Sequence, residues 1–448
     1  MARSYDVIVI GAGPAGEVAA SRLPKLGLRT ALVERELVGG ECAYWACIPS
    51  KTLLRPVEVR EEARRTFGTT APTLDLKEIF EYRDVMIRHL DDSKQVEGYE
   101  KKGAVVVKGE GRITGPGRVE VNGRELEADH IIVATGSSAA VPPIEGLEGV
   151  PFWTNREATT FHEVPGSVLI VGGGPVGIET AQTMSRFGSR VTLVQHADRL
   201  INREDAKVSE IIREVLEEEG IDVRVGRRAE KVRKNGEGVV VELDDGAEIE
   251  VDVLVIGAGR KPRMEGIGLE SVGVETNGKG LLIDEHCRVA EGVWAVGDVT
   301  GVMPFTHVAQ YQGRVLAQNI LGGDGRTNYR GIPRVVFSDP EIAAAGLTEE
   351  QARKQGIDVA ISVLDIPKSL ARPWTYEKAP RGHLGLVADR ERGVLVGAWA
   401  VAPMAGEWIH QAAMAIREEI PITRLLDATA QFPTYSGAYF EALEQLDL

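Results

Sequence analysis

The stretch Tyr5–Arg35, YDVIVIGAGPAGEVAASRLPKLGLRTALVER, decides the fold of this chain. Its pattern returns in Ser167–Ala197, which reads SVLIVGGGPVGIETAQTMSRFGSRVTLVQHA and lies about 160 residues further on. Each stretch is an apolar strand, a glycine-rich turn, an amphipathic helix and a second apolar strand, which together form a βαβ unit. The repeat therefore predicts an α/β protein with two doubly wound, Rossmann-like nucleotide-binding domains.

Both stretches carry the spacing Gly-x-Gly-x-x-Gly between a strand and a helix. Glycines at this spacing permit a tight turn and let a pyrophosphate approach the helix N-terminus, where unpaired N–H groups favour anions. We therefore expect each turn to bind a dinucleotide. The glycines are Gly11, Gly13 and Gly16 in the first turn and Gly172, Gly174 and Gly177 in the second.

The second strands of the two units end differently. Glu34 lies 23 residues after the first glycine of its turn, where a carboxylate binds a ribose hydroxyl. The same step in the second unit reaches Gln195, which is followed by His196 and two arginines. The missing carboxylate favours a 2′-phosphate and hence NADPH. The alternative, that Gln195 binds the ribose of NADH through its amide, stays open.

Composition excludes several classes of partner. The 448 residues include 52 Lys and Arg against 67 Asp and Glu, which gives a formal net charge of −15. Such an acidic chain is unlike proteins whose main partner is nucleic acid or an anionic membrane. No signal peptide or spanning segment is recognisable, so we expect a cytoplasmic protein.

The third motif is a cysteine pair in Gly39–Lys51, GGECAYWACIPSK. We expect no metal site, because no histidine is near and Cys287 alone would leave the ligand set incomplete. Residues five apart in a regular helix have Cα atoms roughly 8–9 Å apart, whereas a disulfide needs ~4.4–6.8 Å. A disulfide between Cys42 and Cys47 thus requires a distorted turn and is easily reduced. The alternative is two buried thiols without a redox role.

This stretch resembles the redox signature GGxCxxxGCxPSK of the flavin-dependent pyridine nucleotide–disulfide oxidoreductases, with Ala46 in place of its glycine. The resemblance extends over nearly the whole chain in the family's order. The further matches are Ala134, Thr135 and Gly136 in a strand-end loop; Val293–Asp298, with Asp298 at the position that contacts the flavin ribityl chain; Met303–Gly313, the helix under the isoalloxazine ring, which includes Ala309; and Val336–Glu341, the start of the dimer-interface domain.

The resemblance implies a role for each matching residue. Cys47 would be the flavin-proximal thiol and Cys42 the interchange thiol that faces the substrate. Lys51 would lie beside flavin N5 with Glu179 as its ion-pair partner, because a cation there stabilises the reduced flavin and a buried lysine requires a counter-charge. Gly259 would complete the NAD(P)-binding set.

The resemblance also implies a domain order and a homodimer. We expect an FAD-binding domain in residues 1–148, an NAD(P)-binding domain in 149–260 and a return to the FAD-binding domain in 261–331. Residues 332–448 would form an α+β dimerisation domain without a glycine turn.

The C-terminal segment departs from the family. Disulfide-reducing members carry a His-Pro-Thr segment that is followed by a Glu, and the His is the general base of the partner subunit's active site. Here Phe432 replaces the His and Gly437 replaces the Glu. Such a base contributes ~10²–10⁴-fold, so efficient turnover of lipoamide or glutathione is not expected. Tyr435 or Tyr439 could act as a weak acid or metal-facing hydroxyl, or could pack in the interface.

The sequence therefore predicts a flavoenzyme that passes hydride from NADPH or NADH through FAD to a Cys42–Cys47 disulfide and on to a small-molecule acceptor. The acceptor stays open between a disulfide such as lipoamide, a metal ion such as Hg(II), and a quinone. A soluble transhydrogenase and a decayed, non-catalytic flavin-binding subunit are the remaining alternatives.

Overall fold

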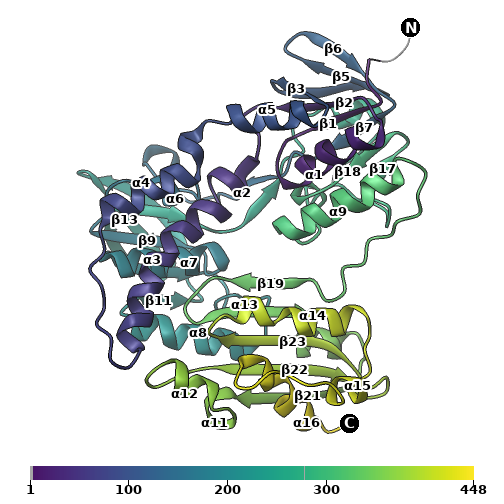
Figure 1. Ribbon diagram of the computed structural model, residues 1–448. Helices are drawn as coiled ribbons and strands as arrows, with labels where there is room; N and C mark the ends of the chain where they lie inside the picture. Colours follow the sequence, from purple (N-terminus) through teal and green to yellow (C-terminus); the bar gives the residue numbers. More distant parts are fainter. Residues whose placement is uncertain (1–3, 277) are drawn as a thin grey trace. The chain divides into compact units, whose positions relative to one another are not determined.

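The computed structural model describes residues 4–276 and 278–448, and the chain divides into two compact units. Figure 1 shows their helices and strands, coloured along the sequence. The two glycine turns lie in different units. The first unit comprises residues 4–49, 81–140, 259–276 and 278–328, and the second comprises residues 50–80, 141–258 and 329–448.

A six-stranded sheet forms the centre of the first unit, in the order β17-β18-β7-β1-β2-β3. From β18 to β3 the strands are parallel, and β17 is antiparallel to β18. All four residues of β1 are buried, as expected for a strand covered on both faces. The strands are β1 Val7–Ile10, β2 Thr30–Glu34, β3 Ala104–Lys108, β7 His130–Val133, β17 Arg288–Ala290 and β18 Val293–Ala295.

Helices α1 and α9 pack against each other beside this sheet. A three-stranded antiparallel sheet and the strand pair β8·β16 complete the first unit. Helices α3 and α4 begin in one unit and end in the other. The elements are α1 Pro14–Arg22, α2 Gly40–Tyr44, α3 Cys47–Arg65, α4 Leu76–Met86, α5 Ser93–Lys101, β4 Gly111–Gly115, β5 Arg118–Val121, β6 Arg124–Glu127, β8 Ser137–Ala139, β16 Arg260–Pro262 and α9 Thr306–Asn319.

The second unit contains the second parallel sheet, ordered β11-β10-β9-β15, with the antiparallel sheet β12-β13-β14. The buried faces of its helices pack on the apolar strands. The elements are α6 Glu157–Thr160, β9 Ser167–Val171, α7 Pro175–Phe187, β10 Arg190–Gln195, α8 Ala206–Glu218, β11 Asp222–Val225, β12 Ala229–Asn235, β13 Gly238–Leu243, β14 Glu248–Val251 and β15 Val253–Ile256.

The C-terminal part of the second unit is a five-stranded antiparallel sheet, ordered β19-β20-β23-β22-β21, against which α14 and α16 pack. All nine residues of β23 are buried. The elements are β19 Pro333–Val336, β20 Glu341–Gly346, α10 Glu349–Lys354, β21 Val359–Asp365, α11 Ile366–Ser369, α12 Arg372–Tyr376, β22 His383–Asp389, β23 Val394–Ala402, α13 Ala405–Trp408, α14 His410–Arg417, α15 Ile422–Leu426 and α16 Ala438–Glu444.

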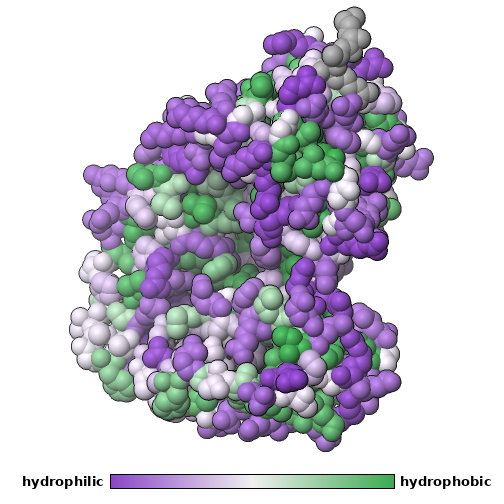
Figure 2. All heavy atoms as spheres, turned by 45° about the vertical axis from the view of Figure 1, so that its right-hand side comes forward, coloured by the Kyte–Doolittle hydropathy of each residue, from purple (hydrophilic) through white to green (hydrophobic). Residues whose placement is uncertain are grey.

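The predicted fold class is confirmed. Each glycine turn belongs to an α/β sheet of parallel strands, and an α+β region ends the chain. The four domain ranges stay predictions. Figure 2 shows hydrophilic residues over most of one face, with hydrophobic residues in separate groups between them. Among the described residues, none of the helices combines the length and the apolar composition that crossing a bilayer requires.

Candidate active site

The first glycine turn connects β1 to α1. A Cβ on Gly11 would lie 2.3 Å from the carbonyl oxygen of Ala134, and a Cβ on Gly16 would lie 1.9 Å from the carbonyl oxygen of Gly11. A Cβ on Gly13 would meet nothing within 4 Å. The outer glycines are therefore required by close packing, whereas Gly13 leaves the backbone open to an approaching phosphate.

Glu34 closes this turn from the end of β2. Its Oε2 accepts the backbone N–H of Ala12 at 2.7 Å, and its Oε1 accepts that of Glu36 at 2.7 Å. The side chain is buried. An ionised carboxylate has about four lone-pair sites, so Glu34 can hold the turn and still accept a bond from a ribose hydroxyl.

The other predicted flavin positions lie at the same edge of the sheet. Ala134, Thr135 and Gly136 follow β7, and Asp298 follows β18. Strand β7 pairs with β1 and β18 pairs with β7, all in parallel, so their carboxyl ends lie at the same edge of the sheet as the glycine turn. A Cβ on Gly297 would lie 3.6 Å from the Cβ of Ala309. The structure thus brings the predicted flavin residues together in the first unit.

A hydrogen-bonded chain that sequence reasoning missed leads from Asp298 to the cysteine turn. Ser137 donates to Asp298 Oδ2 at 2.6 Å, and Arg260 Nε donates to the Ser137 hydroxyl at 2.9 Å. Arg260 also lies 3.8 Å from the carboxylate of Glu41, which Arg263 contacts at 3.1 Å. Glu41 directly precedes Cys42, so this chain anchors the cysteine turn to the flavin edge.

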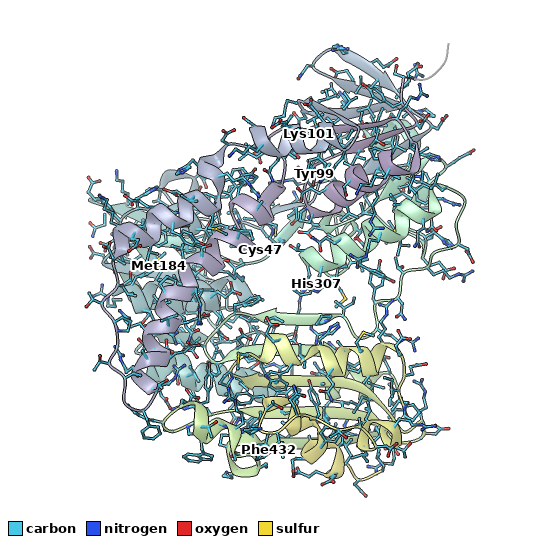
Figure 3. All side chains as sticks on the ribbon, viewed as in Figure 1. Cys47, Tyr99, Lys101, Met184, His307 and Phe432 are labelled. Carbon is cyan, nitrogen blue, oxygen red and sulfur yellow. The ribbon has the colours of Figure 1, made fainter. Side chains whose placement is uncertain are left out.

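The backbone between the two cysteines is interrupted, as the five-residue spacing predicts. Helix α2 ends at Tyr44, Trp45 has φ −137° and ψ 6°, and α3 begins at Cys47. The side chains of Cys42 and Cys47 are hydrogen-bonding neighbours. Figure 3 labels Cys47 on this turn. The break in the helix brings the sulfur atoms into contact.

Thr306 is a functional candidate that sequence reasoning missed. It is the first residue of α9, and its Oγ1 lies 3.2 Å from Cys42 Sγ and 3.4 Å from Cys47 Sγ. The resemblance of Met303–Gly313 to the family's flavin helix could have drawn attention to the hydroxyl that opens it. The thiol pair therefore has a third member, contributed by a distant segment of the first unit.

The environment of Cys42 favours its protonated form. The hydrogen bond with Cys47, burial and the charge of Cys47 raise the pKa of the Cys42 thiol above its usual range. The carboxylate of Glu17 acts in the same direction, and the hydroxyl of Thr306 opposes them. Formation of a Cys42 thiolate thus depends on the groups that donate to its sulfur.

In the second unit the structure brings Lys51 and Glu179 together. Lys51 Nζ lies 2.8 Å from Glu179 Oε2, and the backbone N–H of Phe337 donates to Glu179 Oε1 at 3.0 Å. The ammonium also lies 4.6 Å from the centroid of the Phe337 ring. The carboxylate is therefore held on both oxygens, and the lysine has an ionic and an aromatic neighbour.

Two residues beyond Phe337, Asp339 is held by two arginines, a cluster that sequence reasoning also missed. Arg65 binds it through two bonds of 2.9 Å, and Arg186 lies 3.0 Å from Oδ2. Burial works to raise the pKa of Asp339, but Arg186 and Arg65 outweigh it and hold that pKa below its usual value. Gln182 accepts the Asp339 N–H at 2.9 Å.

The second glycine turn repeats the geometry of the first. A Cβ on Gly177 would lie 1.8 Å from the carbonyl oxygen of Gly172, and a Cβ on Gly174 would meet nothing within 4 Å. Gln195 Oε1 accepts the N–H of Gly173 at 3.0 Å, so an amide closes this turn. The side chain of His196 is exposed at the end of β10.

Gly259, the remaining residue of the predicted NAD(P) set, lies in the first unit. Its carbonyl oxygen accepts the N–H of Ala140 at 2.9 Å. The structure therefore gathers the other predicted NAD(P) residues in the second unit without Gly259.

Comparison with known protein families decides the assignment. Residues 5–313 match the model described as pyridine nucleotide-disulphide oxidoreductase, and residues 332–443 match its dimerisation domain. The chain belongs to this family. The predicted family is thereby confirmed: this protein is an oxidoreductase of a family that uses FAD and NAD(P)H, and its dimerisation domain supports a homodimer.

Curated relatives of this oxidoreductase include mercuric reductases and dihydrolipoyl dehydrogenases. It is 34% identical to the mercuric reductase of Staphylococcus aureus over 443 residues, which cover 96% of this chain and 80% of that protein. It is 36% identical to the dihydrolipoyl dehydrogenase of Thermus scotoductus over an alignment of 458 positions, which covers 99% of this chain and 98% of that protein. The two groups have different substrates, so similarity alone leaves the acceptor open.

Solved structures show the same fold along the whole chain. A Cu(II) complex of the HOCl-induced flavoprotein disulfide reductase RclA from Escherichia coli matches with a TM-score of 0.87 and 27% identity, covering 99% of both chains. LpdA from Mycobacterium tuberculosis matches with a TM-score of 0.88 and 28% identity, covering 98% of this chain and 99% of LpdA.

The C-terminal segment of this oxidoreductase does not carry the His–Glu dyad of its disulfide-reducing relatives. Phe432, at the position of the family's His, is 86% exposed (Figure 3), and Gly437 offers no side chain. Tyr435 is buried against Trp408, and among the described residues its hydroxyl has no hydrogen-bond partner. Tyr439 is buried as well and donates to the carbonyl oxygen of Trp408 at 3.3 Å.

Burial raises the pKa of both tyrosine hydroxyls. Their place inside the second unit favours packing over acid catalysis, and the catalytic role stays a prediction.

Proposed function

We propose that this oxidoreductase takes hydride from NADPH through FAD to a Cys42–Cys47 disulfide, and that the reduced pair passes two electrons to a soft metal ion. The observation that carries the proposal is a thiol pair in mutual contact, combined with a C-terminal segment that has lost its general base.

The residues of the first unit fit FAD. Gly13 leaves backbone open beside the N-terminus of α1, Glu34 retains acceptor sites for a ribose, and Asp298 lies at the same edge of the sheet. Bound there, FAD would supply a two-electron carrier between the nicotinamide and the disulfide. A carrier is needed between them because the nicotinamide gives up its two electrons as a hydride, whereas the disulfide takes up two electrons as a pair.

The residues of the second unit fit NADPH. Gly174 offers the same open backbone at the N-terminus of α7, and the neutral Gln195 closes the turn without repelling a 2′-phosphate. In keeping with the family resemblance, we propose that Lys51 supplies the positive charge that stabilises the reduced flavin. Its pairing with Glu179 holds that ammonium in one place.

The acceptor follows from the chemistry of the thiols. Two neighbouring thiolates are the ligands that soft metal ions prefer. An ion such as Hg(II) held by both sulfurs takes two electrons as its bonds to sulfur break and the disulfide forms again, a step that requires no histidine. Reduction of a disulfide substrate, in contrast, requires a proton donor for the leaving thiol. Mercuric reductases among the relatives support this choice.

The test is steady-state NADPH oxidation by the FAD-loaded protein with Hg(II), Cu(II), a quinone, lipoamide or oxidised glutathione as acceptor. We expect kcat/KM for a metal ion to exceed that for lipoamide by about 100-fold, the contribution of the missing base. Cys42→Ser and Cys47→Ser should abolish metal-dependent turnover. Equal or faster turnover of lipoamide or a quinone overturns the proposed acceptor.

A dye acceptor separates this proposal from the decayed-subunit alternative. The proposal requires NADPH-dependent dye reduction by the FAD-loaded protein. Its complete absence, in protein that retains FAD, would assign a non-catalytic role.

A further inference from the structure

The hydroxyl of Thr306 lies between the two sulfur atoms of the redox pair. Its Oγ1 is 3.2 Å from Cys42 Sγ and 3.4 Å from Cys47 Sγ, and all three residues belong to the first unit. Helix α9 makes no use of this hydroxyl for its own capping, because its N-cap is Phe305 and no side-chain capping bond is formed. The threonine hydroxyl is therefore available to form hydrogen bonds with the two sulfurs.

A hydroxyl between two thiols can serve either of them. It carries one proton to donate and two lone pairs to accept, so it can donate to a thiolate on one sulfur and accept the S–H of the other. Hydrogen bonds to an ionised group are about twice as strong as neutral ones. When the negative charge moves from one sulfur to the other, the O–H bond of Thr306 can therefore rotate to donate to the sulfur that carries the charge.

The remaining surroundings of Cys42 oppose ionisation. Cys47 raises the pKa of the Cys42 thiol by hydrogen bond and charge, burial raises it further, and so does the carboxylate of Glu17. Glu17 in turn accepts a bond from Tyr99 at 2.9 Å and faces Arg88 and Lys102. The Thr306 hydroxyl acts in the opposite direction on the Cys42 pKa.

We propose that Thr306 is a catalytic residue, which stabilises the thiolate on Cys42 and moves it between Cys42 and Cys47. The inference rests on the proposed function, in which a reduced pair must present a nucleophilic Cys42 without a histidine. Thr306 thereby takes over one function of the missing His–Glu dyad, which is to favour the anionic form of the interchange sulfur.

The proton transfer is balanced within the three residues. When the thiolate is on Cys47, the S–H bond of Cys42 breaks and its proton passes to Thr306 Oγ1. The original Thr306 O–H bond breaks, and that proton passes to the sulfur of Cys47. Cys42 is then the thiolate, Cys47 is the thiol, and no electrons have moved.

The direct hydrogen bond between the thiols does not make Thr306 redundant. A thiol on Cys47 has only one proton to donate to a Cys42 thiolate. The hydroxyl adds a second donor to that thiolate, and Thr306 is placed to be this donor.

The test compares Thr306→Val, which removes the hydroxyl at nearly constant shape, with Thr306→Ser, which keeps it. The full-length protein is reduced with a phosphine, alkylated with iodoacetamide at pH 7, and analysed by peptide mass spectrometry for the rate at each cysteine. Thr306→Val should slow alkylation of Cys42 by about tenfold or more relative to Cys47, because alkylation follows the thiolate fraction. Thr306→Ser should restore the wild-type ratio.

The matched control is Thr114→Val at an exposed position of strand β4, where the hydroxyl contacts Glu125. It should leave both rates unchanged. An unchanged Cys42:Cys47 ratio in Thr306→Val overturns the inference, and so does a Thr306→Ser variant that behaves like Thr306→Val while keeping the wild-type melting temperature. A merely structural role would lower stability without changing the ratio.

The assay needs neither NADPH nor FAD, so it separates the two proposals. If the wild-type protein fails to oxidise NADPH while Cys42 alkylation still depends on Thr306, the proposed function fails and the inference about Thr306 stands. If NADPH reduces the pair normally and Thr306→Val has no effect on alkylation, only the inference about Thr306 fails.

Discussion

The two glycine turns have the same backbone but are closed by different side chains. In the first unit the carboxylate of Glu34 accepts two backbone N–H groups, from Ala12 and Glu36. In the second unit the amide oxygen of Gln195 accepts one, from Gly173. The closing bond from strand to turn is thus independent of charge. The closing bond is present in both turns and the charge differs, so we propose that the bond shapes the turn and the charge selects the nucleotide.

The largest effect is expected where the turns are identical. Gly16→Ala and Gly177→Ala each place a Cβ less than 2.0 Å from a carbonyl oxygen, so each should lower the free energy of unfolding by about 3 kcal/mol in urea titrations. Gly16→Ala should lose FAD. Gly177→Ala should retain FAD and lose NADPH oxidation.

The controls are Gly13→Ala and Gly174→Ala, at open positions with ordinary φ values of −74° and −87°. They should change stability by less than about 1 kcal/mol while weakening nucleotide binding. If Gly177→Ala also releases FAD, the two turns do not act independently.

A second effect tests the charge cluster around Asp339 in the second unit. Asp339→Asn leaves Arg65 and Arg186 without their shared counter-charge, which should cost about 3 kcal/mol of unfolding free energy. The measurement is urea denaturation, with exposed Asp447→Asn as the control. A loss no larger than that of the control would show that the arginines are satisfied by Glu377 and Glu219 alone.

A third effect is a pH dependence of stability in the second unit. Burial raises the pKa of Glu341 to about 7, above its ordinary value of 4.5. The folded protein therefore binds the proton more tightly than the unfolded chain, and stability should fall as pH rises from 4.5 to about 7. Glu341→Gln should remove about 2 kcal/mol of this fall. A variant whose stability depends on pH as the wild type does would contradict the assignment.

The smallest effect is expected when each of the residues that close the turns, Gln195 and Glu34, is replaced by the type found in the other turn. Gln195→Glu keeps the acceptor for Gly173 and adds a negative charge, so the ratio of kcat/KM for NADPH to that for NADH should fall about tenfold. Glu34→Gln leaves one of two N–H groups without an acceptor and should weaken FAD binding by about tenfold. An unchanged coenzyme ratio in Gln195→Glu would show that Gln195 does not determine coenzyme preference.

Local patterns predicted much of the fold and part of the site. The glycine spacing predicted both turns because strand, turn and helix follow each other directly in the sequence, in Val7–Arg22 and in Ser167–Phe187. The five-residue spacing of Cys42 and Cys47 predicted a broken helix, because a regular one keeps such residues apart. The resemblance to the family named Lys51 and Glu179, which the structure brings to 2.8 Å.

Contacts between distant segments were not predictable in this way. Thr306 is 264 residues from Cys42, and Glu41 is 222 residues from Arg263. No periodicity or spacing relates such positions, because only the packing of strands and helices brings them together. The sequence left open whether Tyr435 and Tyr439 pack or act as acids, since it does not show which side of α16 and of the turn before it faces the sheet.

The residue pattern was enough to predict two glycine turns of the dinucleotide-binding type and a redox-active cysteine pair, and it places Phe432 where the family has its general base. These features depend on residue type and short spacing, which act through backbone sterics and local hydrogen bonds. The groups that surround the cysteines could be read only from the folded chain, because folding brings together donors and charges from distant segments, and these set the pKa of a buried thiol. The fold positions one hydroxyl, that of Thr306, against both sulfurs.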